Sequence, residues 1–180
     1  MDHRYVALLR GINVGRAKRV AMADLRGLLQ DLGYADVRTL LNSGNVVFTA
    51  PDGTPDGAAA RIGQAMAARL GVSARVTVIS AAELSAVVGE NPLLPVADDP
   101  ARLLVAVLAD PADRPRLEPL TAQDWSPEAL ALGRRAAYLW CPDGFMASRL
   151  REAVESALGD AVTMRNWATV TKLHALAGGL

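Results

Sequence analysis

The strongest chemical signal in this sequence is a short basic stretch between a predicted strand and a predicted helix. It runs Arg10-Gly11-Ile12-Asn13-Val14-Gly15-Arg16-Ala17-Lys18-Arg19 and holds four positive charges and two glycines. Backbone amides at a helix N-terminus, together with guanidinium groups, form an anion site. The spacing fits neither the Walker pattern nor the dinucleotide fingerprint. Arg10, Asn13, Arg16 and Lys18 are therefore candidate ligands of a small anion, and a merely solvated turn is the alternative.

A second group of candidates lies in the turn-prone sequence Asn42-Ser43-Gly44-Asn45. Ser43 and Asn45 can supply neutral hydrogen-bond donors beside the arginines. In a ferredoxin-like unit this hairpin shares one edge of the sheet with the end of the first strand and the start of the fourth. We therefore expect residues 10–19, 42–45 and 71–73 to converge. Asn and Gly in a hairpin are equally well explained by positive φ angles, so a purely structural role stays open.

The third group lies where the last predicted strand meets the last predicted helix. Arg165 and Asn166 are candidate ligands there, and Asn166 is also a predicted N-cap, with Thr169 in the first turn of the helix. Trp167 is expected to dock the helix onto the core rather than to stack on a ligand. Arg165 and Lys172 can either extend an anion site or pair with acids on the surface.

No motif gives a positive signal for catalysis. The two histidines, His3 and His174, have no Cys, Asp or Glu at metal-ligand spacing. The sequence contains no nucleophile elbow of the form G-x-S-x-G. The single cysteine, Cys141, excludes a disulfide framework and is expected to be a buried small residue. We predict no metal and no cofactor, and the sequence leaves open whether the protein is an enzyme.

Hydrophobic periodicity predicts the elements that position these residues in the first half of the chain. The expected order is a buried strand at 5–9, a helix ending at Gly33, a hairpin with strands 36–41 and 46–49, a helix at 58–70, and a strand at 74–79. The first strand is apolar on both sides, whereas a strand with one solvated face alternates with polar residues. We therefore expect both faces of its sheet to be covered.

The second half repeats this order. Strands are expected at 103–108, 129–132, 136–140 and 161–164. The first helical stretch, 111–120, contains Pro115 and Pro119 and is expected to be short or broken. A stripe with helical spacing, Met146, Leu150, Val154 and Leu158, predicts the other helix. Further helices are expected at 81–88 and at about 167–177, with a Pro-bounded linker at 91–100.

The repeated order predicts an α+β protein with two tandem ferredoxin-like (βαββαβ) halves and a C-terminal helix. The predicted domains are the first half, 1–80, then a short helix and linker, 81–100, and then the second half with the C-terminal helix, 101–180. Two unrelated α+β segments that merely alternate are the remaining alternative.

The composition narrows the classes of partner. The chain has 19 basic and 19 acidic residues, and this balance argues against indiscriminate polyanion binding. Aromatic residues make up 4% of the chain, too few for an RNA-stacking platform. No apolar run approaches the roughly 20 residues of a membrane span, and no signal peptide precedes the first strand. We expect a cytoplasmic protein with no membrane partner, and the oligomeric state is open.

Three sets of motifs also carry a family resemblance: residues 5–15, Val37-Arg38-Thr39 with residues 42–48, and Arg165-Asn166-Trp167 with residues 169–173. In these motifs the sequence resembles the bacterial family catalogued as domain of unknown function 1697. The resemblance implies a compact two-part α+β fold with ferredoxin-like halves, without an established activity or catalytic residues. Arg16 replaces a glycine usual in the family and makes the first loop more cationic. Ala168 replaces a usual polar residue and weakens a catalytic role for the last junction.

The sequence leaves three possible functions open. The leading one is a ligand-binding protein that holds a small anionic or phosphorylated molecule at cationic edge loops. The second is an enzyme that uses the same cleft, with Arg10 and Arg165 as electrostatic stabilisers and Ser43 or an unplaced carboxylate in proton transfer. A nucleic-acid-binding module is the weakest, because stacking aromatics are scarce.

Overall fold

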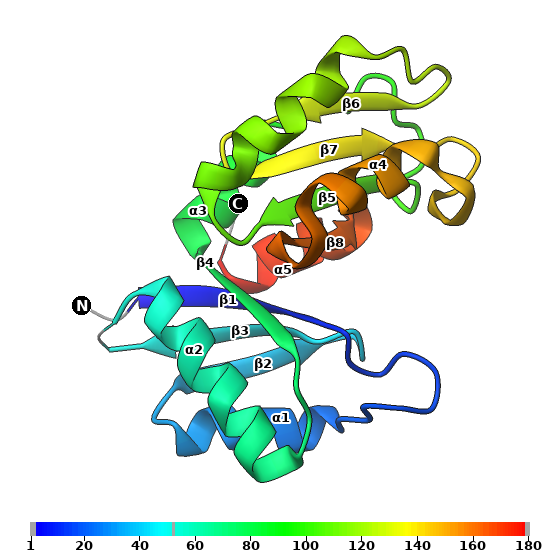
Figure 1. The fold of residues 1–180 in the computed structure, drawn as a ribbon. Helices are drawn as coiled ribbons and strands as arrows, with labels where there is room; N and C mark the ends of the chain where they lie inside the picture. The colour runs from blue at the N-terminus through cyan, green and yellow to red at the C-terminus, as the bar shows by residue number, and fades with distance from the viewer. Residues whose placement is uncertain (1–2, 52, 179–180) are drawn as a thin grey trace. The chain divides into compact units, whose positions relative to one another are not determined.

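The computed structural model describes residues 3–51 and 53–178 and shows a mixed α/β fold (Figure 1). Two four-stranded sheets, each entirely antiparallel, are its framework. The chain divides into two compact units, the first comprising Met1–Leu84 and Leu173–Leu180 and the second Ser85–Lys172. The predicted domains kept the last helix whole, whereas the compact units divide it between them. Among the described residues, no helix is long and apolar enough to cross a membrane.

The first unit contains a sheet with the strand order β2-β3-β1-β4. The order along the chain is the predicted one, and the predicted hairpin is present as β2 and β3. Its elements are β1 (His3–Arg10), α1 (Met22–Asp31), β2 (Ala35–Leu40), β3 (Asn45–Ala50), α2 (Pro55–Ala65), the π-helical segment η1 (Met66–Leu70) and β4 (Arg75–Ser80).

Local sequence explains where the helices of this unit begin and end. The Thr54 hydroxyl caps α2 by accepting a hydrogen bond from the Gly57 N–H at 3.1 Å, and Pro55 fits the first helical position because it needs no donor there. The helical segment that follows α2 ends at Gly71, which has a left-handed φ of 64°. Gly33, with φ 91°, follows α1 in the same way.

The core of the first unit lies between one face of the sheet and the helices α1 and α2. Tyr5, Ala7 and Leu9 of β1 belong to it. The alternate residues Val6 and Leu8 point to the other face, yet they are only 0% and 3% exposed. The prediction that both faces of this sheet are covered is therefore confirmed.

The second unit contains a sheet with the strand order β6-β7-β5-β8. Helix α3 (Ala81–Gly89) precedes it, and α5 (Trp167–Leu176) follows it. The elements between them are β5 (Leu103–Leu108), the 3-10 helix η2 (Pro111–Ala122), β6 (Ala129–Leu132), β7 (Ala136–Trp140), η3 (Phe145–Ala147), α4 (Arg149–Leu158), η4 (Gly159–Ala161) and β8 (Val162–Asn166).

Two helical segments of this unit show how prolines and caps act. The stretch expected to be a short or broken helix is instead one continuous 3-10 helix of 12 residues, Pro111–Ala122, so the prediction is wrong in length and continuity. Pro115 and Pro119 lie inside it, and because proline lacks an N–H donor they are incompatible with regular α-helical hydrogen bonding. The predicted start of the next helix at Met146 is wrong. Ser148 caps α4 by accepting from the Arg151 N–H at 3.0 Å, so Met146 lies before the helix and is 76% exposed.

The core of the second unit lies between one sheet face and the helices η2 and α4. Leu150, Val154 and Leu158, the rest of the predicted stripe, are buried in it. On the other face, the Tyr138 hydroxyl of β7 donates to the Val87 carbonyl of α3 at 2.6 Å. Burial raises the pKa of this phenol, which therefore stays protonated and can donate.

Candidate functional site

The basic stretch forms a closed loop at the end of β1, and Asn13 holds it shut. The Asn13 N–H donates to the Lys18 carbonyl at 3.0 Å. Its side-chain Oδ1 accepts from the Val20 N–H at 2.8 Å, and its Nδ2 donates to the Val20 carbonyl at 2.9 Å. Both donors of the amide are used, since Nδ2 also donates to the Asn42 carbonyl at 2.7 Å. Asn13 thus positions the loop and ties it to the β2–β3 turn.

The β2–β3 turn packs directly against the end of β1. The Leu9 N–H donates to the Gly44 carbonyl at 2.8 Å. Gly44 has φ 90°, and a Cβ at this position would lie 2.7 Å from Leu9 Cβ, so only glycine fits. Asn45 is fully buried and donates to the Leu40 carbonyl at 2.7 Å and to Ser43 Oγ at 2.9 Å. The expected convergence is therefore confirmed for residues 10–19 and 42–45, with Asn45 as a supporting residue, whereas the convergence of residues 71–73 with them stays a prediction.

The positive charge of the loop is concentrated on exposed side chains. Arg16, Lys18 and Arg19 are exposed, and none of them has a carboxylate partner among the described residues. Arg10, at the base of the loop, lies opposite Arg75 in the β1–β4 register. The register of β1 and β4 therefore places two further arginines at the same edge of the sheet.

The backbone of the loop adds hydrogen-bond donors to these charges. Left-handed φ angles at Gly11, Asn13, Gly15 and Lys18 curl the chain. Residues Gly15 and Arg16 form a turn, and within residues 3–51 and 53–178 the N–H groups of Val14, Gly15, Arg16, Lys18 and Arg19 have no hydrogen-bond acceptor. Uncommitted N–H groups beside guanidinium and ammonium groups are the donors that bind phosphate or carboxylate. The loop can therefore bind an anion.

Sequence reasoning omitted two residues from this candidate site, Arg19 and Arg75. Arg19 lies in the basic stretch itself. Arg75 is placed beside Arg10 only by the antiparallel register of β1 and β4. The prediction that the first and fourth strands lie close together was the signal that could have found Arg75. The sequence did not give the pairing register of these two strands.

The other two predicted site residues, Arg165 and Asn166, belong to the second unit. Asn166 Oδ1 accepts from the Thr169 N–H at 2.9 Å, which confirms the predicted N-cap of α5. Arg165 lies on β8 opposite Val105, and its Nη1 donates to the Met164 carbonyl at 2.9 Å. Burial lowers the pKa of this guanidinium to about 10, so it remains charged at neutral pH.

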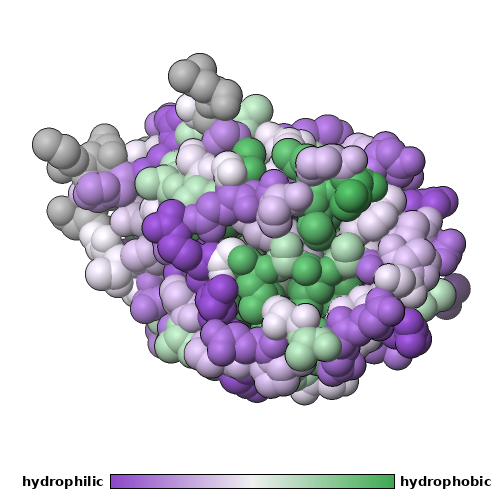
Figure 2. Space-filling view, turned by 90° about the horizontal axis from the view of Figure 1, so that it is seen from above, coloured by the Kyte–Doolittle hydropathy of each residue, from purple (hydrophilic) through white to green (hydrophobic). Residues whose placement is uncertain are grey.

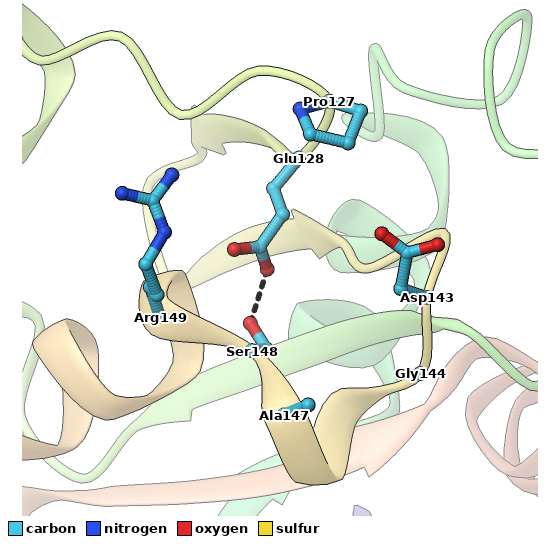
Figure 3. A pocket seen from close by; sticks show the side chains of 7 residues that line it. All are labelled: Pro127, Glu128, Asp143, Gly144, Ala147, Ser148 and Arg149. Carbon is cyan, nitrogen blue, oxygen red and sulfur yellow. Dashed lines mark hydrogen bonds between the residues drawn. The ribbon is translucent and has the colours of Figure 1, made fainter.

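A pocket of about 180 Å³ in the second unit contains a pair of groups that resembles a proton-transfer site (Figure 3). The Ser148 hydroxyl donates to Glu128 Oε2, and the carboxylates of Glu128 and Asp143 lie around the same space. Ser148 Oγ also accepts from the Arg151 N–H, and Glu128 Oε1 accepts from the Leu150 N–H at 3.4 Å. These groups therefore hold the first turn of α4.

Cys141 contacts the same cluster without becoming reactive. Its Sγ lies 3.4 Å from Ser148 Oγ, and the residue is 1% exposed. Burial raises the pKa of the thiol to about 11, which keeps it protonated at neutral pH. The prediction of a buried small residue is confirmed. Among the described residues, no group of three or more His, Cys, Asp or Glu side chains is placed to hold a metal ion.

A solved structure and a family profile are similar to this chain. No curated protein matches the sequence. A solved structure, that of the conserved bacterial protein SP0830 from Streptococcus pneumoniae, superimposes with a TM-score of 0.79 at 22% sequence identity. The match covers 98% of this chain and 99% of that chain, and at this identity it shows the fold alone. A family profile matches residues 2–138, and the chain therefore belongs to the family described as protein of unknown function (DUF1697).

Proposed function

We propose that the protein binds a small anionic molecule, such as a phosphorylated metabolite, at the loop from Gly11 to Arg19. One observation carries the proposal. The loop presents the backbone N–H groups of Val14, Gly15, Arg16, Lys18 and Arg19 and three exposed cations, and neither set has a partner among the described residues. Each charge-assisted hydrogen bond to a phosphate oxygen contributes about 1.5–3 kcal/mol.

The chemistry of the loop favours binding over catalysis. Residues 11–19 include no Asp, Glu, His, Cys, Ser or Thr, so the loop itself offers no side chain for proton transfer at neutral pH. Asn13 is committed to four backbone partners. Arginine, lysine and backbone N–H groups recognise and hold negative charge, and this is the function of a ligand site.

The size of the charged region favours a small ligand over a polymer. The formal net charge of the whole chain is zero, so the protein has no overall excess of positive charge to attract a polyanion. A nucleic acid needs a long cationic track or a platform of stacking aromatics. A molecule with one or two phosphate groups matches a single loop with three exposed cations.

We also propose that the two units are ferredoxin-like halves related by duplication. Both sheets place their strands in the order second, third, first, fourth, and all neighbouring strands are antiparallel. This order and the hairpin between the second and third strands support a common βαββαβ plan. An experimental structure with different strand orders in the two sheets would contradict it.

A thermal-shift screen of phosphorylated metabolites, followed by calorimetric titration, tests the binding proposal. A ligand that binds only the native state raises the melting temperature. Inorganic pyrophosphate serves as the simplest probe. The variant Arg16→Ala/Lys18→Ala/Arg19→Ala is expected to bind at least about tenfold more weakly, because the loss of even one contact worth about 1.5 kcal/mol lowers the affinity by that factor.

The matched control is Arg69→Ala, which removes an exposed arginine of the same unit whose Nη2 pairs with Asp31 at 2.6 Å. It should leave the affinity unchanged. Circular dichroism confirms that each variant is folded. A screen without any stabilising anion, or a triple variant that binds as tightly as the wild type, would overturn the proposal.

A further inference from the structure

Two charged side chains at the pocket of the second unit have no structural partner. Asp143 and Arg149 both line this pocket of about 180 Å³, and both residues are exposed. Neither side chain forms a hydrogen bond or an ion pair with another described residue. The hydrogen bonds of Ser148 and Glu128 hold the first turn of α4, whereas nothing in that turn needs these two charges.

The charge of Arg149 reaches one carboxylate, that of Asp124, at longer range. Hydrogen bonds with Ser126 are the main cause that lowers the pKa of Asp124, and Arg149 adds a smaller electrostatic contribution. The Asp124 carboxylate accepts from the Ser126 N–H at 3.0 Å. Asp124 is therefore held by its own turn, and the Arg149 guanidinium keeps its donors for another acceptor.

The local chain places the two free charges on different sides of the pocket. Asp143 follows β7 and precedes a turn at Gly144, which has φ 92°, and Arg149 is the first residue of α4. Figure 3 shows Arg149 on one side of the pocket and Asp143 on the other, with the Glu128 carboxylate between them. A small pocket thus has separated charges of opposite sign in its lining.

Glu128 adds to the negative side of the pocket, and its position is fixed. Its Oε2 accepts from the Ser148 hydroxyl, and its Oε1 accepts from the Leu150 N–H at 3.4 Å. Each carboxylate oxygen has two acceptor sites, so Glu128 can accept further hydrogen bonds from a ligand. A carboxylate that is already held in place loses little side-chain freedom when the ligand binds.

Hydrophobic contacts contribute little to this pocket. Where hydrophobic residues gather on the surface seen in Figure 2, they form an area ringed by hydrophilic residues. The lining of the pocket contains only two apolar side chains, those of Pro127 and Ala147. A ligand of the pocket must therefore be held by charges and hydrogen bonds.

We propose that this pocket binds a small zwitterion, namely a free α-amino acid. Arg149 binds its carboxylate, because a planar guanidinium can form two parallel hydrogen bonds with a carboxylate. Asp143 and Glu128 bind its ammonium group, which has three N–H donors. A ligand with only one charge would leave the opposite charge of the pocket unpaired. Pockets for drug-sized ligands measure about 300–1,000 Å³, so a pocket of about 180 Å³ suits a single amino acid.

The first test compares zwitterions with ligands that have only one of the two charges. The full chain is screened by thermal shift with the standard L-amino acids at up to about 10 mM, where a ligand with a Kd of about 1 mM occupies most of the native state. At least one amino acid is expected to raise the melting temperature. Calorimetric titration then compares it with its amide, which lacks the carboxylate, and its N-acetyl derivative, which lacks the ammonium group. Both analogues should bind at least about tenfold more weakly.

Three variants assign the binding to this pocket. Arg149→Ala and Asp143→Ala each remove one of the free charges and are expected to weaken the amino acid at least about tenfold. Ala147→Leu fills the pocket without changing a charge and should abolish binding. Because Ala147 is exposed, the added side chain does not overpack the core.

Matched controls separate loss of the site from a general effect of charge. Arg116→Ala removes an arginine of the same unit whose Nη1 pairs with Asp113 at 3.2 Å, and Glu152→Ala removes an exposed carboxylate of α4. Both should bind the amino acid like the wild type, and circular dichroism confirms that each variant is folded. This inference concerns the second unit and does not depend on the anion loop of the first.

Several outcomes would overturn the proposal. One is a screen in which no amino acid stabilises the protein. Another is an amide or N-acetyl derivative that binds as tightly as the amino acid, because the pocket would then hold a simple cation or a simple anion. Unchanged affinity in folded Arg149→Ala, Asp143→Ala or Ala147→Leu would place the amino acid at a different site.

Discussion

Two asparagine side chains hold the loop at 11–19 and the adjacent β2–β3 turn in shape by hydrogen bonding to backbone groups. Asn13 uses its amide to link both backbone groups of Val20 to the Asn42 carbonyl, and the buried Asn45 ties Leu40 to Ser43. Both residues were predicted as ligands because their types and their place beside the arginines suited an anion. In the structure they support the loop and the turn. Which partner an amide takes depends on three-dimensional contacts that spacing does not show.

Cys141 provides a pH-dependent prediction at the scale of one residue. In the unfolded chain a thiol ionises near its usual pKa of 9.0, whereas burial holds the pKa in the native state at about 11. Between these values the native state retains a proton that the unfolded state has lost, so stability falls as pH rises. We expect this to cost the wild type roughly 2 kcal/mol between pH 9 and pH 11.

The control for this effect is Cys141→Ala, which removes the titrating group. Urea unfolding at a series of pH values measures the free energy of unfolding of both chains. The difference between wild type and variant should shrink as the pH rises from 9 to 11. Parallel stability curves would show that the thiol is not held protonated by the fold.

Two helical segments of the second unit, η2 and α4, show which features of a helix the local sequence pattern predicts and which it does not. Prolines at 115 and 119 led to the prediction of a short or broken helix at 111–120, whereas the chain forms a continuous 3-10 helix over 111–122. The start of α4 was mispredicted because Met146 has the right spacing for its stripe. The cap that begins this helix combines Ser148 with Glu128, and their contact spans 20 residues. The spacing of apolar residues along the sequence does not predict a contact between residues so far apart.

The β2–β3 turn depends on one glycine, and its replacement tests the packing of the hairpin against β1. Gly44→Ala introduces a Cβ 2.7 Å from Leu9 Cβ at a residue with φ 90°. We expect a loss of about 2–3 kcal/mol in the free energy of unfolding, from backbone strain and overpacking together. Chemical denaturation of wild type and variant measures it.

Gly27→Ala is the matched control because it lies inside α1, where an added Cβ meets no atom within 4 Å. Alanine is the better helix former, so this change is expected to stabilise the protein by about 0.5–1 kcal/mol. Opposite signs for the two substitutions would support the packing argument. Equal effects would mean that the close contact at Gly44 is relieved at little cost.

At the scale of the whole molecule, the order of the strands in each sheet could be predicted from the sequence. The division of helices α3 and α5 between the two compact units could not. Two hairpins and antiparallel neighbours leave few arrangements for a four-stranded sheet. Residues up to Leu84 belong to the first unit, as do those from Leu173 onward, so each helix is divided. The register that places Arg75 opposite Arg10 was likewise a property of the assembled sheet.

The charge balance of the whole chain leads to the last prediction, which concerns polyanions. With 19 basic and 19 acidic residues, the protein has no excess of positive charge that would attract a phosphate polymer over a broad surface. The cations of one loop can neutralise only a few phosphates. We expect no binding of labelled single-stranded DNA by fluorescence anisotropy at about 0.15 M salt, where the Debye length is about 8 Å. Pyrophosphate should still bind at the loop under the same conditions. Tight DNA binding that disappears in the Arg16→Ala/Lys18→Ala/Arg19→Ala variant would instead make a nucleic acid the ligand of this site.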